Sequence, residues 1–235
     1  GVISTGSTNF YVLGNIIHDI SGAAIKARAT QGNYYVGNTI YRAGLGIHTQ
    51  AGNDFAHVIN NIIGERTGTH HILFENSATA AASEMDHNIL YQPGDSANIS
   101  WGGTNYTVTS FIGANPAKGA GLIEANPLFV DAASNNYLLK AGSPAINAGR
   151  ESGTVDSVMN TFQSLYGVSL RFDYARTQRL VGTVWDIGVY EYTGATNSDT
   201  TAPAVSLTTP ANNAIVAGSS ISVSASASDN VGVTG

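Results

Sequence analysis

Six side chains in the first third of the chain have the chemistry to bind or deprotonate an acidic molecule. They are cationic, imidazole, amide and carboxylate groups: Lys26, Arg28, His48, Gln50, His71 and Glu75. A neutral lysine or histidine can remove a proton, and an arginine can stabilise the anion that forms. Residues this far apart in sequence act together only if the fold stacks the segments that carry them.

A short repeat indicates such stacking. An asparagine followed by two residues, mostly isoleucine, recurs at Asn15, Asn38, Asn61 and Asn88, in steps of 23, 23 and 27 residues. A unit this short cannot bury a core alone, so it indicates one coil of a solenoid built from stacked strands. The four asparagines are predicted to form a ladder of hydrogen bonds from coil to coil. Turn residues such as Ala43-Gly44 and Thr67-Gly68 are predicted to divide each coil between its two aliphatic sites.

Two sets of aliphatic residues hold constant places in the repeat and are predicted to point inward. They are Ile17, Ile40, Ile63 and Leu90, and further along Ile25, Ile47, Ile72 and Ile99. Strand side chains alternate, so the neighbours of the second set should form outward columns. These columns are Ala24, Gly46, His71 and Asn98; Lys26, His48, Leu73 and Ser100; and Arg28, Gln50, Glu75 and Gly102. Adjacent coils lie about 4.8 Å apart, which would bring the six reactive side chains into one exposed patch.

This patch suits an acidic polysaccharide. In β-elimination, Lys26 or His48 would remove the proton next to the uronate carboxyl group, and Arg28 would stabilise the resulting charge. Gln50, His71 and Glu75 would contact the substrate. Hydrolysis needs two carboxylates about 5–9.5 Å apart, and this face offers only Glu75, so it is less well supported. Charged residues on a strand face also serve solubility and edge protection, which leaves a binding or structural role open.

The coils resemble those of right-handed parallel β-helix proteins, which include pectate-lyase-like and alginate-lyase-like enzymes. The matching segments are Asn15-Ile16-Ile17-His18, Gly37-Asn38-Thr39-Ile40-Tyr41 and Asn60-Asn61-Ile62-Ile63. The resemblance implies an all-β chain with a right-handed parallel β-helix in residues 1–119. It also implies a lysine on one coil and an arginine on the next, at places held here by Arg28 and by His48 or Gln50. The acidic pair that holds calcium in such enzymes falls at Ala23 and Ala24.

The chain differs from the enzymes it resembles at these positions, and the differences decide which cofactor and which enzyme class can be expected. No motif supports calcium, and no other cofactor is expected. The neighbouring His70 and His71 should point to opposite faces of a strand, so no metal site is predicted. Enzyme activity stays open, because the same coils occur in lyases, hydrolases, epimerases and non-enzymatic surface proteins.

Residues 120–193 lack the repeat and resemble the choice-of-anchor Q type of module that closes many secreted β-helices. The resemblance rests on Asn126-Pro127-Leu128-Phe129, Gly142-Ser143-Pro144-Ala145-Ile146-Asn147 and Asp186-Ile187-Gly188-Val189-Tyr190-Glu191. Such a segment is expected to cover the open end of the last coil. The apolar residues predicted to do so are Phe129, Leu138, Ile146, Ile187 and Tyr190. Apolar spacing predicts a short helix over 155–166.

The last part of the chain changes character. Residues 194–202 are polar and predict a flexible linker. Residues 203–235 resemble the opening of a bacterial Ig-like domain, with strand-like stretches at 205–207, 215–216 and 221–225. A complete sandwich needs about seven strands, so this piece should lack a core of its own. Its presence predicts a secreted or cell-surface protein.

The composition of the chain limits the classes of partner that it is expected to bind. The formal net charge is -6 and the chain has no run of basic residues, which argues against nucleic acid. No apolar run reaches the roughly 18 residues of a membrane span. The first residues read like the middle of a strand, so we expect a longer protein whose further coils could also carry site residues.

The sequence therefore predicts a monomeric extracellular β-helix that binds, and could cleave, an acidic polysaccharide. The alternative is a non-catalytic adhesive rod or spacer.

Overall fold

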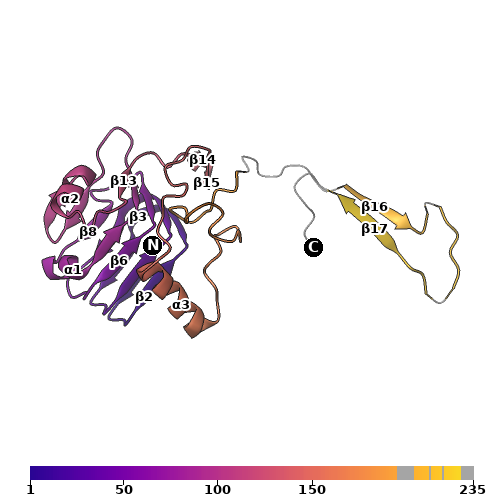
Figure 1. Cartoon of the computed structure of the whole chain (residues 1–235), viewed down its shortest axis with the longest axis horizontal. Coiled ribbons are helices and arrows are strands. Elements are labelled where there is room, and N and C mark those ends of the chain that lie inside the picture. The colour runs from indigo at the N-terminus through magenta and orange to yellow at the C-terminus, as the bar shows by residue number, and fades with distance from the viewer. Residues whose placement is uncertain (195–203, 212, 219, 229–235) are drawn as a thin grey trace. The chain divides into compact units, whose positions relative to one another are not determined.

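The chain folds as a parallel β-helix, residues 1–194, and a second compact unit, residues 195–235 (Figure 1). The computed structural model describes residues 1–194, 204–211, 213–218 and 220–228. Neighbouring coils pair through parallel strands, and the side chains between the strands form the core. The predicted solenoid is therefore confirmed.

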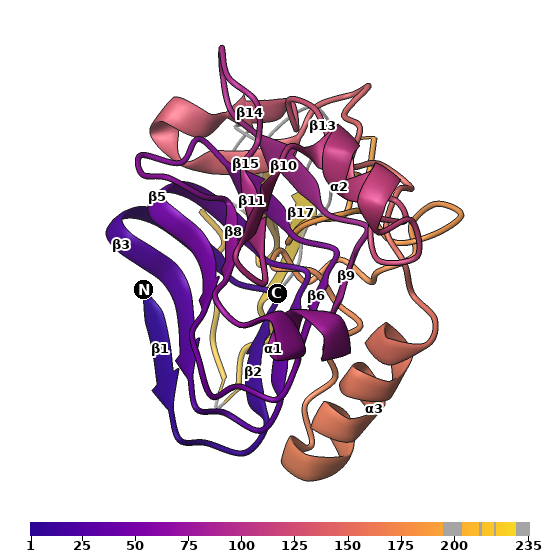
Figure 2. The same cartoon turned by 90° about the vertical axis from the view of Figure 1, so that its left-hand side faces the viewer.

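Two sheets form the β-helix, and every coil contributes to both. The larger sheet contains β1 (Val2–Thr5), β3 (Ile16–Arg28), β5 (Thr39–Thr49), β7 (Ile62–Gly64), β8 (Ile72–Phe74), β10 (Ile89–Tyr91), β11 (Ile99–Trp101), β12 (Thr104–Tyr106) and β13 (Ile123–Glu124). The smaller sheet contains β2 (Phe10–Leu13), β4 (Asn33–Val36), β6 (Ala56–Ile59) and β9 (Glu84–Asp86). Figure 2 shows β2, β6 and β9 on the side of the β-helix that faces α3.

Both predicted aliphatic stacks are confirmed by the strand register. Ile25 pairs with Ile47, Ile47 with Ile72, and Ile72 with Ile99, and all four are fully buried. The other set is also buried and in register: Ile17, Ile40, Ile63 and Leu90. Burying each side chain stabilises the fold by at most about 1.5–3 kcal/mol.

The predicted asparagine ladder is confirmed as well. The side-chain amide of Asn15 donates to Asn38 at 3.2 Å, Asn38 to Asn61 at 2.9 Å, and Asn61 to Asn88 at 2.9 Å. Each oxygen also accepts the backbone N–H of the preceding asparagine. The ladder therefore satisfies polar groups at a buried corner, where unpaired groups would be costly.

The prediction that turns divide every coil is wrong for the first two complete coils. There β3 and β5 run unbroken through Ser21-Gly22 and Ala43-Gly44, and only later coils are divided, into β7 and β8 and into β10 and β11. Glycine is still required at this place, because a Cβ atom on Gly44 would lie 2.2 Å from the carbonyl oxygen of Ser21. Close approach between coils, rather than a turn, explains the glycine here.

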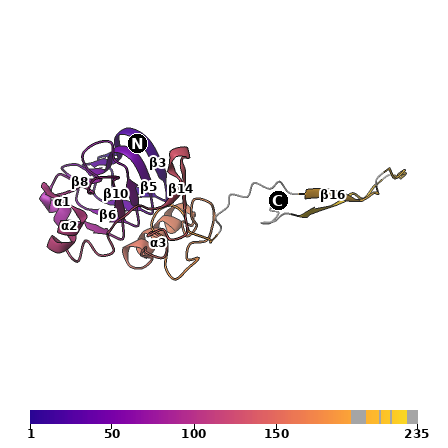
Figure 3. The same ribbon diagram turned by 90° about the horizontal axis from the view of Figure 1, so that it is seen from above.

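Residues 104–122 close the end of the stack after β11. The strand β12 pairs antiparallel with β11, and α2 (Val108–Ala114) follows it. Phe111 is fully buried, with its ring 5.4 Å from that of Trp101. A shorter helix, α1 (Ser77–Ala82), lies near α2 at the same end (Figure 3). Residues 104–119 thus cover the end beside β11, and from the predicted covering segment Leu122 and β13, which pairs with β10, add to that cover.

Most of residues 120–193, which we call the flank segment, pack along the side of the coils. Phe129 and Ile187 are buried in a cluster with Tyr41, Ile62 and Ile89, which come from three successive coils. Ile146 and Tyr190 pack against this cluster, as expected for apolar residues of this segment. Leu138 is not among its members, because the alternation of β15 (Asn136–Leu139) buries its neighbours, Tyr137 and Leu139. The strand β14 (Phe129–Asp131) pairs with β15, and a 3-10 turn, Ala132–Ser134, joins them.

The predicted helix over 155–166 is confirmed as α3 (Thr154–Tyr166). Val155, Met159 and Trp185 are buried with Val36 and Ile59 in a further cluster. The helix thereby covers the outer face of the smaller sheet, as Figure 2 shows. Within the described residues, no helix is both long and apolar enough to cross a membrane.

The second unit contains an antiparallel hairpin of β16 (Ala204–Thr209) and β17 (Ser224–Ser228). The predicted stretch 205–207 lies within β16, and only Ser224 and Ala225 of the stretch 221–225 lie in β17. The predicted stretch 215–216 is wrong, because these residues are not in a strand. All residues of both strands are exposed, in line with a piece that lacks a core. The predicted linker, apart from Gly194, lies outside the described residues.

Candidate functional site

Five of the six reactive side chains come from neighbouring places on adjacent coils. Lys26 on β3 is the register partner of His48 on β5. Arg28, Gln50 and Glu75 follow at the ends of their strands, where backbone bonds join Gln50 to Ala27 and Glu75 to Thr49. Arg28 and Glu75 are exposed, Lys26 and Gln50 are half-buried, and His48 is buried. We call this set, Lys26, Arg28, His48, Gln50 and Glu75, the basic strand face.

An imidazole–carboxylate pair lies at the centre of the basic strand face. His48 Nε2 is 2.7 Å from Glu75 Oε1, and the backbone N–H of Ala51 donates to Glu75 Oε2 at 3.3 Å. The hydrogen bond from His48 lowers the pKa of the Glu75 carboxyl group. The pair fixes the imidazole ring, and its carboxylate lies on the second coil along from Lys26 and Arg28.

His71 does not belong to the patch, and the predicted first outward column is wrong. Ala24, Gly46 and His71 are buried, and a Cβ atom on Gly46 would lie 2.5 Å from Ile63 Cγ2. Ala24 belongs to the same buried cluster as Ile25, so the strict alternation assumed from Ile25 does not hold at this place.

The ring of His71 instead joins two coils. Its Nε2 donates to the carbonyl of Tyr91 at 3.0 Å, and its Nδ1 accepts the N–H of Asn98 at 3.2 Å. Burial lowers the pKa of His71 to about 4, so the ring is neutral at pH 7. The role of His71 is structural, because its buried side chain cannot contact a substrate.

An ionic cluster on the smaller sheet was not found from the sequence. The carboxylate of Glu84 lies 2.9 Å from His57 Nδ1 and 2.6 Å from Arg150 Nη1, and it accepts the hydroxyl of Thr154. Arg150 also pairs with Asp86. These contacts lower the pKa of Glu84 and hold the start of α3 against the sheet. Arg150 and Thr154 lie outside the repeat, so the repeat gave no signal for the cluster.

An aromatic row crosses the same sheet next to this cluster. Tyr11 stacks on Tyr34 with ring centroids 4.8 Å apart, and Tyr34 stacks on His57 at 5.3 Å. Because the rings occupy each other's faces, they offer mainly their edges to a ligand. The row therefore supports the stack of coils more directly than it supports stacking on sugar rings.

Metal ligands do not gather in the described part of the chain. No group of three or more histidine, cysteine, aspartate or glutamate side chains is placed there to hold a metal ion.

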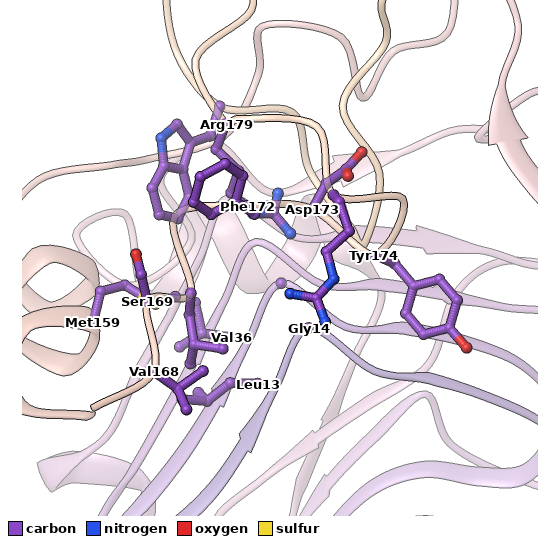
Figure 4. A pocket seen from close by; sticks show the side chains of 14 residues that line it. Leu13, Gly14, Val36, Met159, Val168, Ser169, Phe172, Asp173, Tyr174 and Arg179 are labelled. Atoms are coloured by element: carbon purple, nitrogen blue, oxygen red, sulfur yellow. The ribbon is translucent and has the colours of Figure 1, made fainter. Parts of the chain in front are cut away.

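A cavity of about 510 Å³ lies between the coils and the C-terminal part of the first unit. Figure 4 shows the aliphatic side chains of Leu13, Val36 and Val168 close together, with Tyr174 on another side of the cavity. None of the six predicted site residues lines it. Most of its walls come from residues 159–185, where no repeat marks positions, so the sequence could not locate it.

Comparisons with known proteins cover only the end of the chain. Residues 203–235 match a family described as a bacterial Ig domain. No curated protein and no solved structure matches the chain. The C-terminal segment is thus similar to a bacterial Ig domain, in agreement with its predicted resemblance.

Proposed function

We propose that the protein is an extracellular glycan-binding β-helix whose basic strand face binds an acidic polysaccharide. The observation that carries the proposal is the register of Lys26 with His48, with Arg28 exposed beside them. Lys26 and Arg28 stand two residues apart on β3 and so face the same side of the strand, where an extended polyanion could contact both at once. The Ig-like match at 203–235 supports a position outside the cell.

Binding is preferred to cleavage for a geometric reason. Catalytic sites usually lie in clefts that exclude water, whereas these side chains project from strands and line no part of the described cavity. His48 is also held by Glu75. A partly exposed face of this kind is suited to a long ligand that makes many weak contacts.

The test is binding of alginate, pectate and chondroitin, with dextran as an uncharged control. Affinity electrophoresis or calorimetry should detect at least one polyanion, and binding should weaken as salt rises. Lys26→Gln and Arg28→Gln should each reduce affinity, whereas Lys140→Gln, which changes an exposed cation of the flank segment, should not. Equal losses for all three variants would indicate a general charge effect and would contradict a site on this face.

Cleavage by β-elimination is the second candidate, because Lys26 and His48 are adjacent and can supply a base and a cation. The reaction removes the proton next to the carboxyl group, expels the glycosidic oxygen and leaves a carbon–carbon double bond. The same incubations would then show ultraviolet absorbance from unsaturated uronates. The double variant Lys26→Ala/His48→Ala should abolish it, and unchanged turnover would exclude these residues. Binding without absorbance would support the binding proposal alone. The absence of both binding and absorbance would favour a structural spacer.

A further inference from the structure

The cavity of Figure 4 has an open floor formed by two glycines. Gly14 and Gly37 occupy equivalent turns of successive coils, with φ of 64° and 67°. No heavy atom lies within 4 Å of a Cβ atom built on Gly14, so the space above it is free. Left-handed backbone favours glycine at both turns. The absence of a side chain leaves room for a ligand at Gly14, whereas a Cβ atom on Gly37 would already lie 3.5 Å from the Arg179 guanidinium.

The walls of the cavity combine apolar and polar surface, and several of the apolar side chains are partly exposed. Phe172 is 46% exposed and Tyr174 is 61% exposed, and Val168 beside them is 50% exposed. Leaving this much apolar surface in water is unfavourable, and a ligand that covers it would gain hydrophobic free energy. A volume of about 510 Å³ is within the usual range for sites that bind small molecules.

Two of the three charged groups in the lining are already satisfied by the protein. Asp173 accepts the N–H groups of Thr177 at 2.7 Å and Glu191 at 3.0 Å. Arg179 is buried, pairs with Glu191 at 3.1 Å and donates to the carbonyls of Gly188 and Val189. These groups shape the cavity but have few free positions for a ligand.

Arg176 supplies the charge that remains available. It is exposed and lines the cavity, and its side chain makes no hydrogen bond or ion pair with the described residues. Its φ of 69° places it at a turn whose backbone N–H bonds to the carbonyl of Asp173. The cavity thus combines an apolar body with one accessible cation.

We propose that this cavity binds a small carboxylic acid with an aromatic or branched aliphatic body. The carboxylate pairs with the Arg176 guanidinium, and the apolar body covers Phe172 and Val168. This site is distinct from the basic strand face in its residues and in the size of its ligand. It does not depend on the polysaccharide proposal.

The test uses the two tryptophans of the chain as reporters in the full-length protein. Trp185 lines the cavity, and Trp101 does not. Their indole N–H signals can be followed by NMR and assigned with Trp101→Phe. Phenylacetate at millimolar concentration should shift the Trp185 signal in a saturable way and leave Trp101 unchanged. Acetate, which lacks the body, and phenethylamine, which carries the opposite charge, should bind at least several-fold more weakly.

Variants test the residue assignment. Arg176→Asn keeps a residue that tolerates positive φ and should weaken phenylacetate about three-fold, because exposed ion pairs are weak. Arg176→Lys should retain most of the affinity, and Lys140→Gln should retain all of it. Val168→Phe should reduce binding by filling part of the cavity, with an unchanged melting temperature as the check on folding. No saturable Trp185 shift, or equal binding of phenethylamine, would overturn the proposal.

Discussion

His48 Nε2 lies 2.7 Å from Glu75 Oε1, across two adjacent coils of the β-helix. Glu75 is exposed and also accepts the N–H of Ala51. The carboxylate therefore stands fixed two coils away from the cations Lys26 and Arg28. A polyanion that binds those cations and lies across the coils would also meet this negative charge, which makes Glu75 the informative position for the binding proposal.

Glu75→Gln should strengthen the binding of an acidic polysaccharide by about two- to five-fold at low salt, because a like charge is removed from the face. The gain should shrink as ionic strength rises. Affinity electrophoresis in alginate or pectate gels would measure both effects. Glu151→Gln is the matched control, since it removes a carboxylate from the flank segment. A change in affinity no larger than that of Glu151→Gln would show that the polyanion does not approach this face.

The asparagine ladder should contribute unequally along its length. Asn61→Ala removes a fully buried amide that donates to Asn88 and to the carbonyls of Tyr35 and Ile59. It should lower the free energy of unfolding by about 2–4 kcal/mol, because buried partners lose their hydrogen bonds. Asn15→Ala, at a half-buried position, should cost about 1 kcal/mol. Urea unfolding would compare them, and equal losses would contradict the dependence on burial.

Positions that recur in every coil could be predicted from the sequence. Asn38 and Asn61, or Ile47 and Ile72, occupy the same place in successive repeats, so their contacts follow from the period alone. The alternation of side chains failed at Ala24, because Ala24 and its neighbour Ile25 both lie in the buried core, which strict alternation does not allow. That failure is why His71 was assigned to the surface.

Contacts between the coils and the flank segment could not be predicted in the same way. Arg150 reaches Glu84 on β9 across a separation that no repeat fixes, and the same is true of the pair of Arg179 and Glu191 within residues 120–193. Their positions depend on how residues 120–193 pack against the side of the coils. The same packing forms the cavity near Trp185, so the sequence could not indicate it.

His71 should make stability depend on pH in a defined window. Its pKa is about 4 in the folded protein, compared with about 6.5 in an unfolded chain. The unfolded state therefore binds the proton first on acidification. The stabilisation is complete above pH 6.5 and is lost as the pH falls toward 4, by at most about 3 kcal/mol.

Urea unfolding between pH 7.5 and 4.5 would measure this loss. His71→Gln should unfold more easily at pH 7.5 but lose less stability between the two pH values than the parent chain. His70→Gln, at the neighbouring half-exposed position, should leave the pH dependence unchanged. An identical slope for His71→Gln and the parent would assign the window to other groups.

The buried pair of Arg179 and Glu191 should be strongly coupled. Burial raises the pKa of Glu191, while the Arg179 guanidinium, 3.1 Å away, opposes that rise. Asp173 and Asp186 are buried nearby, and they also interact electrostatically with Arg179. Arg179→Met would leave these carboxylates without their cation and should cost about 3–5 kcal/mol of folding free energy.

A double-mutant cycle measures that coupling. Glu191→Gln combined with Arg179→Met should cost less than the sum of the two single changes, since the paired charges are removed together. Arg171→Gln is the control, because Arg171 pairs with Asp156 at 2.5 Å where both side chains are well exposed. That change should cost less than about 1 kcal/mol. Additive losses in the cycle would show that the pair contributes no specific interaction to the flank segment.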